Sequence, residues 1–328
     1  MSRRTAWFWP VALAGLLPVC TWAADARDWL TRMEQAVETM NYEGTFVHIA
    51  GGTMETMQVV HRVKDGRVTE RLYSRDQPGR EVIRKDEKVT CIFADQRTVL
   101  VEQRKSQERS PLRAALPRYS AELDRWYEFR EGGNGRKLGR VVRMVEILPR
   151  DSLRYGHRLW LDEATAMPLK VQLVDSSGRA VEEVQFVSIE LPATIPDARL
   201  EPAVDLGGFS WYVHDPDELA AEGEANPGWT ASDVPSGFRL MTARRQFLPG
   251  ASQAVEHLVY SDGLASISVF VEPADSVDEA LKGASRIGGA SAFSTVHEGH
   301  QITAVGEVPA STVREVARSL RPVADSRQ

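Results

Sequence analysis

Short runs of alternating apolar and polar residues, separated by tight turns, fill the stretch between residues 41 and 102. Asp65-Gly66 tolerates the positive φ values of a type I′ turn and lies between two such runs, at residues 57–63 and 68–73. Three more runs follow at residues 80–84, 89–93 and 98–103, after a turn that contains Pro78-Gly79. This spacing predicts a meander of antiparallel strands with one apolar face.

An apolar stripe with three- and four-residue steps predicts a helix directly before these strands. The stripe consists of Trp29, Leu30, Met33, Val37 and Met40. Asp28 is expected to begin the first turn, and Asn41 ends the periodic run. We expect this helix to pack its apolar side on the sheet.

Further extended runs follow later in the chain. Residues 126–131 and 138–148 flank a predicted turn at Gly132-Gly133-Asn134-Gly135, and residues 157–161, 169–174 and 181–189 complete the series. About ten or eleven strands in one antiparallel sheet must curl because strands twist, so the pattern predicts a strongly bent half-barrel.

Residues 106–126 interrupt the strands with two prolines and apolar residues on a basic background. A pair of short helices across the open sheet would fit this composition. Two interpretations stay open: the segment covers an apolar cavity as a lid, or it packs on the sheet as ordinary core. The candidate residues for a lipid cavity and its lid are Phe46, Met57, Leu72, Leu112, Leu116, Tyr119, Leu123 and Trp126.

The pattern changes after residue 192, where prolines, paired glycines and an acidic run indicate a solvated linker. We therefore predict a half-barrel domain at residues 24–205, an acidic Pro/Gly linker at 206–227 and a small α+β domain at 228–322. The second domain should contain strands at 238–247, 255–260 and 266–272, a helix near 277–281, a strand pair about Gly299, and a last helix at 311–320 capped by Ser311. The fold class is α+β, mainly β.

The first 23 residues have the form of a secretory signal peptide, with Arg3-Arg4 at the start, an apolar stretch, and Thr21-Trp22-Ala23 as a cleavage site. A retained membrane anchor is the less favoured alternative, because Pro10 and Pro18 break the apolar stretch. A signal peptide predicts export to an oxidising compartment. Cleavage would leave Cys91 as the only cysteine, so no intrachain disulfide is expected and Cys91 is interpreted as a small buried hydrophobic residue.

Net charge argues against nucleic acid as a partner. The chain carries −6, and removal of the two arginines with the signal segment leaves −8. Between residues 97 and 143, however, twelve basic residues oppose six acidic ones, among several aromatic side chains. Such a region suits an anionic amphiphile or an acidic peptide, although solubility alone would explain it. The candidates for this contact are Arg97, Arg104, Arg113, Arg118 and Arg125.

The sequence contains no constellation that is typical of an enzyme. Its seven histidines form no His-Glu-x-x-His pattern, and no Gly-x-Ser-x-Gly elbow is present. His297 and His300 are three residues apart, but the intervening Gly299 favours a hairpin turn over a zinc site. We expect neither a cofactor nor a bound metal, and a binding protein rather than an enzyme.

Several stretches together resemble the MucB/RseB family of periplasmic sigma-factor regulators. In the first domain these are Asn41-Tyr42-Glu43-Gly44-Thr45-Phe46-Val47, Glu70-Arg71-Leu72, Arg80-Glu81-Val82-Ile83-Arg84, Val99-Leu100-Val101-Glu102 and Arg158-Leu159-Trp160-Leu161-Asp162. In the second they are the run from Tyr260-Ser261-Asp262-Gly263 to Val269-Phe270-Val271-Glu272 and the segment Val305-Gly306-Glu307-Val308-Pro309.

The resemblance implies that the first domain is similar to the LolA/LolB lipoprotein carriers, with an apolar concavity under helices. It also implies a partner, the periplasmic domain of a transmembrane anti-sigma factor, which the protein would shield from site-one proteolysis and release on sensing lipid or lipopolysaccharide acyl chains. The protein would then be peripheral to the membrane through its partner, with homo-oligomerisation left open. The alternative is a periplasmic lipid or lipoprotein carrier, which would use the same concavity to deliver cargo.

Overall fold

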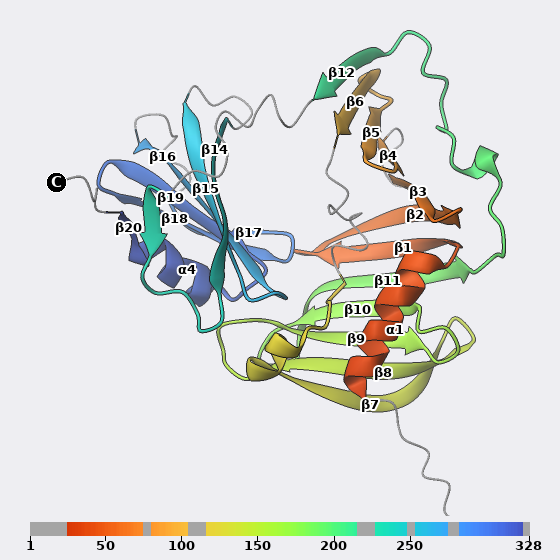
Figure 1. Ribbon diagram of the computed structural model, residues 1–328, viewed down its shortest axis with the longest axis horizontal. Coiled ribbons are helices and arrows are strands. Elements are labelled where there is room, and N and C mark those ends of the chain that lie inside the picture. Colours follow the sequence, from red (N-terminus) through yellow and green to blue (C-terminus); the bar gives the residue numbers. More distant parts are fainter. Residues whose placement is uncertain are drawn as a thin grey trace, which may run out of the picture.

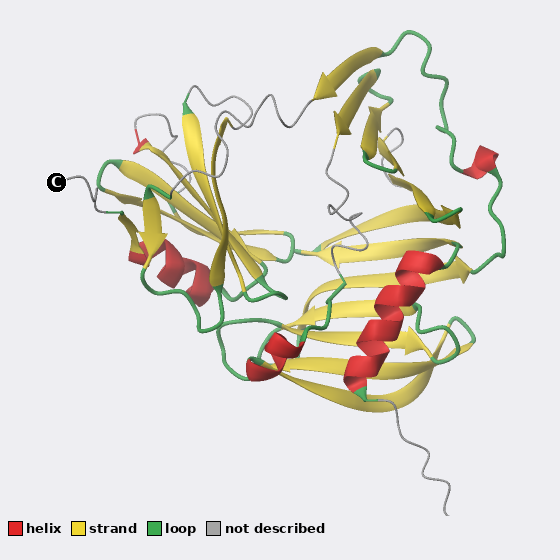
Figure 2. Cartoon of the chain, viewed as in Figure 1, coloured by secondary structure: helices red, strands yellow, loops and turns green. Residues whose placement is uncertain are grey.

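The computed structural model describes residues 25–74, 80–103, 116–214, 227–247, 253–274 and 282–323. Two sheets dominate it, one of twelve strands and one of six, with a small two-stranded sheet beside the second (Figure 1). The large curved sheet carries helix α1 across its concave side, and the smaller sheet carries helix α4 (Figure 2). This arrangement confirms the predicted fold class.

The large sheet has the strand order β12-β6-β5-β4-β3-β2-β1-β11-β10-β9-β8-β7, and its neighbours are antiparallel except for the parallel pair β12 and β6. Its strands are β1 (Tyr42–Ala50), β2 (Thr53–Lys64), β3 (Arg67–Ser74), β4 (Arg80–Lys85), β5 (Lys88–Phe93), β6 (Thr98–Gln103), β7 (Tyr127–Lys137), β8 (Arg140–Pro149), β9 (Gly156–Asp162), β10 (Pro168–Val174), β11 (Ala180–Glu190) and β12 (Ser210–His214).

The first predicted hairpin is confirmed, and the later one is shifted. Asp65 and Gly66 have φ values of 52° and 74° and join β2 to β3 as expected. The predicted turn at residues 132–135 is wrong, because these residues lie inside β7, where the register shifts between Glu131 and Asn134. A Cβ on Gly132 would lie 2.2 Å from Cε of Met144, so glycine serves close packing here. The chain turns instead at Leu138-Gly139.

Helix α1 (Ala26–Thr39) confirms the predicted apolar stripe. It begins two residues before Asp28, because the side chain of Asp25 accepts a hydrogen bond from the backbone N–H of Arg27 and caps the helix. Trp29, Leu30 and Met33 are almost fully buried against the concave face of the sheet. The helix thereby fills the space that strands β7–β11 and β1 enclose.

The segment before β7 contains one short 3₁₀ helix, η1 (Ala121–Arg125), in its described part. Of the predicted pair of helices, only this element lies in the described residues, and residues 104–115 lie outside them.

The large sheet continues beyond the predicted array. Residues 191–209, which we call the strap, leave β11 and include a 3₁₀ helix, η2 (Asp197–Arg199), before β12 begins. The sequence pattern assigned residues 206–227 to a linker and did not predict β12 within them. The domain limits themselves stay a prediction.

The smaller sheet has the order β14-β15-β16-β19-β18-β17, and β13 pairs with β20 beside it. Its elements are β13 (Trp229–Ala231), β14 (Arg239–Phe247), β15 (Ala254–Ser261), β16 (Ser266–Pro273), β17 (Gly283–Ile287), β18 (Ala290–His297), β19 (His300–Gly306), α4 (Ala310–Ser319) and β20 (Leu320–Pro322). Glu298-Gly299 forms the β18–β19 turn, as predicted. Ser311 is not the cap of α4, because the helix already begins at Ala310 after Pro309. The helix predicted near residues 277–281 lies outside the described residues.

Cys91 lies in β5 and is half-buried, so its side chain is less enclosed than the sequence suggested.

Candidate functional site

The concave face under α1 is occupied by side chains. Phe46, Leu72 and Leu123 are buried at 5%, 5% and 1% exposure within one apolar cluster that also contains the stripe of α1. Met57, Tyr119 and Trp126 are partly buried against the same cluster. Seven of the eight cavity and lid candidates are thus brought together, as part of a packed core, and Leu112 lies outside the described residues.

An apolar row continues from this core toward the far edge of the sheet. Leu72 lies opposite Val82 on β4, Val82 opposite Cys91 on β5, and Cys91 opposite Leu100 on β6. Burial decreases along this row, from 5% exposure at Leu72 to half-buried side chains on β4, β5 and β6. The row ends at Tyr212 on β12, which is 60% exposed. This part of the concave face is where the described structure leaves apolar surface accessible.

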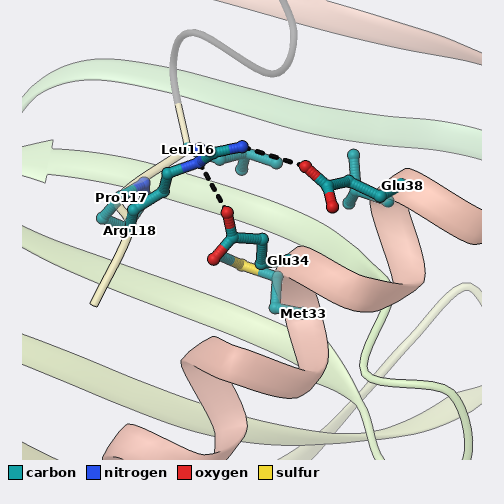
Figure 3. Close-up of a pocket in the computed structure, with 7 residues that line it drawn as sticks. Met33, Glu34, Glu38, Leu116, Pro117 and Arg118 are labelled. Atoms are coloured by element: carbon teal, nitrogen blue, oxygen red, sulfur yellow. Dashed lines mark hydrogen bonds and ion pairs between the residues drawn. The ribbon is translucent and has the colours of Figure 1, made fainter. Parts of the chain in front are cut away.

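Arg118 ties the described part of the candidate lid to α1. Its guanidinium nitrogens lie 2.7 Å from Oε1 of Glu34 and 2.9 Å from Oε1 of Glu38 (Figure 3). The small pocket beside these ion pairs is bounded by Met33 and Leu116 and has a volume of about 20 Å³. That volume holds about one water molecule, so an acyl chain does not fit there in this arrangement.

A second polar cluster holds the 3₁₀ helix on the other end of α1. Nε of Arg27 donates to Oδ1 of Asp124 over 2.9 Å, and the hydroxyl of Tyr119 donates to Oδ2 of Asp124 over 3.0 Å. The hydrogen bond from Arg27 lowers the pKa of Asp124, and burial raises the pKa of Tyr119. The ring of Tyr119 meets that of Phe129 edge to face, with centroids 5.2 Å apart. Tyr119 is therefore held in place from both sides.

The basic candidates do not form one patch in the described residues. Arg97 lies in the β5–β6 turn, Arg118 is engaged with α1, and Arg125 is exposed at the end of the 3₁₀ helix. Arg104 and Arg113 lie outside the described residues. A larger hollow of about 410 Å³ is lined by charged side chains such as Arg62, Lys64 and Lys85, which does not suit an acyl chain.

A buried ion pair that sequence reasoning missed joins the two sheets. Nη1 of Arg154 donates to Oδ2 of Asp262 over 2.8 Å, and both side chains are fully buried. The hydroxyl of Tyr127 donates to the same carboxylate oxygen over 2.9 Å, and Arg154 also donates to the carbonyl of Ser236. We call these four residues the Arg154 contact. Asp262 lies in the Asp262-Gly263 turn, within the stretch of the second domain that resembles the family. Arg154, its partner, is 108 residues away in the sequence.

Aromatic rings enclose the Arg154 contact. The guanidinium carbon of Arg154 lies 5.2–5.6 Å from the ring centroids of Trp126, Tyr127 and Phe238. Gly237 has a φ of 92°, and a Cβ there would lie 2.4 Å from the indole of Trp126. Trp126, a predicted lid residue, is thus also a domain-contact residue. Removal of Arg154 would leave the Asp262 carboxylate buried without a cation, whereas Arg154 has a second carboxylate, that of Asp151, 3.2 Å from its Nη2.

A second contact between the sheets lies at the end of the β1–β2 hairpin. Nε2 of His48 lies 2.8 Å from Oε1 of Glu182, and Glu307 of the second domain is close enough to contribute to the raised pKa of His48. The hydrogen bond to Glu182 raises the pKa of His48, and burial raises the pKa of Glu307. A Cβ on Gly289 would lie 2.0 Å from a carboxylate oxygen of Glu182, so the backbone of the second domain approaches β11 closely here.

The described part of the chain contains no group of three or more His, Cys, Asp or Glu side chains that could hold a metal ion. Within it, neither helix is long and apolar enough to cross a membrane.

Comparison with known proteins covers both parts of the chain. Residues 25–204 match the MucB/RseB N-terminal domain, and residues 223–321 match the MucB/RseB C-terminal domain. The chain is 34% identical to the sigma factor AlgU regulatory protein MucB of Pseudomonas aeruginosa over 320 residues, which are 95% of this chain and 96% of that protein. It is 28% identical to the sigma-E factor regulatory protein RseB of Salmonella typhimurium, over 89% of each.

Solved structures agree with these matches. The crystal structure of MucB in complex with MucA(peri) superposes with a TM-score of 0.69 at 31% identity, over 92% of this chain and all of that one. The crystal structure of MucB by itself gives a TM-score of 0.62 at 30% identity, over 92% of this chain and 99% of that one. With both domain families matched in order, this chain belongs to the MucB/RseB family.

Proposed function

We propose that this chain is a periplasmic negative regulator of an envelope-stress sigma factor. It binds the periplasmic domain of a transmembrane anti-sigma factor and shields that domain from site-one proteolysis. The observation that carries the proposal is the likeness, over nearly the whole chain, to a MucB crystallised with MucA(peri). Binding rather than catalysis is proposed as the activity, in keeping with the regulatory names of the relatives.

Binding and protection can be measured with the purified full chain and the periplasmic segment of the anti-sigma factor from the same organism. We expect a specific complex, and we expect site-one cleavage of the segment to slow in proportion to the fraction bound. Unchanged cleavage at saturating protein would contradict the shielding role. Capture of lipoproteins in place of the anti-sigma factor would support the carrier alternative.

Lipid sensing is proposed for the accessible apolar row that ends on β6 and β12. Burying apolar surface is worth about 25 cal/mol per Å², so an acyl chain lying along Val82, Cys91 and Leu100 would gain a few kcal/mol. Such binding releases the partner only if the lipid prefers the released form of the protein. The proposal therefore requires that lipid and anti-sigma segment weaken each other's binding by the same factor.

Leu100→Asp tests this site, because it puts a charge in the apolar row. We expect lipid A to lower the affinity of the wild-type protein for the anti-sigma segment and to have little effect on Leu100→Asp. Val187→Asp is the matched control, since Val187 is 47% exposed on β11, away from the row. Equal lipid responses in both variants would place the lipid elsewhere.

A further inference from the structure

Strand β12 exposes three consecutive large apolar side chains at the edge of the large sheet. Trp211, Tyr212 and Val213 are 50%, 60% and 73% exposed. They lie opposite Val99, Leu100 and Val101 of β6, so Trp211 and Val213 point to one side of the sheet and Tyr212 to the other. Both faces of this edge are therefore apolar and accessible.

The strap holds β12 in this position through contacts with one strand after another. Nδ2 of Asn41 donates to the carbonyl of Ala193, and the guanidinium groups of Arg62 and Arg71 donate to the carbonyls of Ile195 and Arg199. The backbone N–H of Ala203 donates to Oε2 of Glu81 over 3.1 Å.

The end of the strap is anchored by apolar contacts. Leu206 and Phe209 pack on a cluster that contains Ile92, Val99 and Val101. The N–H of Ser210 then donates to the carbonyl of Arg97 over 2.9 Å and starts the parallel pair. A segment that only joined two domains would not need this succession of contacts.

Pairing with β6 uses one edge of β12, and no described strand pairs with its other edge. That edge presents alternating backbone N–H and C=O groups over five residues, a length of about 16 Å. Proteins usually protect such edges with charged residues or proline, and residues 211–213 contain neither. An acyl chain cannot use these backbone groups, whereas an extended polypeptide can.

We propose that β12 is a docking strand for an extended segment of the anti-sigma factor, which pairs with the open edge and packs apolar side chains on Trp211, Tyr212 and Val213. This inference rests on the proposed function and names the surface that performs it. A partner is favoured over a second copy because the chain is similar to a MucB that was crystallised with MucA(peri). The docked segment should alternate apolar and polar residues, as an extended strand does.

Polar replacement of the exposed side chains tests the proposal. Threonine keeps the strand propensity, so Trp211→Thr/Val213→Thr should fold with an unchanged Tm. We expect its affinity for the anti-sigma segment to fall at least tenfold, and Tyr212→Thr to show a smaller loss. Met54→Thr is the control, because Met54 is 64% exposed on β2 of the same sheet, and it should bind like the wild type.

The outcomes distinguish a failure of the proposed function from a failure of the docking inference. A wild-type chain that does not bind the segment contradicts the proposed function and this inference together. Wild-type binding that Trp211→Thr/Val213→Thr retains in full overturns the inference alone. A dimer in sedimentation that this double variant dissociates, with segment affinity unchanged, would assign the edge to a second copy and also overturn it.

Discussion

The two halves of the large sheet differ in what covers their concave face. In the closed half, strands β7–β11, the apolar stripe of α1 fills the curve, and side chains such as Leu159 and Leu161 are completely buried. In the open half, strands β3–β6 with β12, the apolar row runs from Leu72 at 5% exposure through half-buried side chains to Tyr212 at 60% exposure. One continuous sheet therefore combines a packed core with an accessible apolar surface.

The second domain is attached on the closed side. Tyr127 of β7, together with Arg154 in the turn before β9, meets Asp262. Glu182 of β11, near the end of the β1–β2 hairpin, also lies close to Gly289 of the second domain. The closed half therefore packs against the second domain, while the open half keeps an accessible apolar surface.

The largest expected effect concerns the Arg154 contact. Arg154→Ala leaves Asp262 buried without its cation, which costs about 3–5 kcal/mol in comparable buried pairs. We expect a marked loss of stability and a larger separation of the domains in small-angle scattering. Arg179→Ala is the control, because the Arg179–Asp175 pair is 79% exposed at the arginine and should contribute below about 1 kcal/mol. Equal effects of the two variants would contradict a structural role for the buried pair.

Truncation of apolar side chains should lower the free energy of unfolding more in the closed half than in the open half. Leu30→Ala, in the closed half, removes a side chain that is 1% exposed and should lower the free energy of unfolding by about 2–5 kcal/mol. Leu100→Ala, in the open half, should cost only about 1 kcal/mol because its side chain is half-buried. Denaturant titration of both variants measures the difference. Similar losses would mean that the open half is packed as tightly as the closed one.

The smallest expected effect is a pH dependence at the second contact. Because its pKa is raised in the folded protein, His48 contributes stability that is fully present below its ordinary value of 6.5 and is lost as pH rises through the raised value. The Tm difference between wild type and His48→Gln should therefore shrink from pH 6 to pH 8.5, by a small amount because solvent screens this partly exposed pair.

The difference in Tm between wild type and His48→Gln separates the pH dependence due to His48 from that due to other titratable groups. Glu307 also has a raised pKa, whereas burial lowers the pKa of His157 to about 4 and gives the opposite slope. Both groups remain in the variant. A Tm difference that stays constant over this range would rule out a charged His48 at the contact.

The fold was predictable where local pattern decides it. Alternation identified the strands of the meander, and the three- and four-residue steps identified α1 and its buried face. The turn near residue 132 was misplaced because Gly132 serves the close approach of Met144, a contact 12 residues away that no local pattern reveals. Strand β12 was missed because its side chains do not alternate and its position depends on strap contacts with distant strands.

The candidate site was predictable only in part. Apolar positions such as Phe46 and Leu72 were correctly placed on the concave face, but sequence alone could not tell core from cavity lining. Arg118, a candidate for contact with an anionic ligand or a partner, pairs with Glu34 and Glu38 of α1, which the sequence did not predict. The Arg154 contact was missed because an ion pair between distant residues leaves no local signal.

Hydrogen exchange of the full chain, with and without the anti-sigma periplasmic segment, tests the division between the halves most directly. We predict that added protection on binding is concentrated in β6 and β12, while α1 and β7–β11 exchange at the same rates in both states. Protection confined to α1 and β7–β11, with β12 unchanged, would contradict this division between the halves.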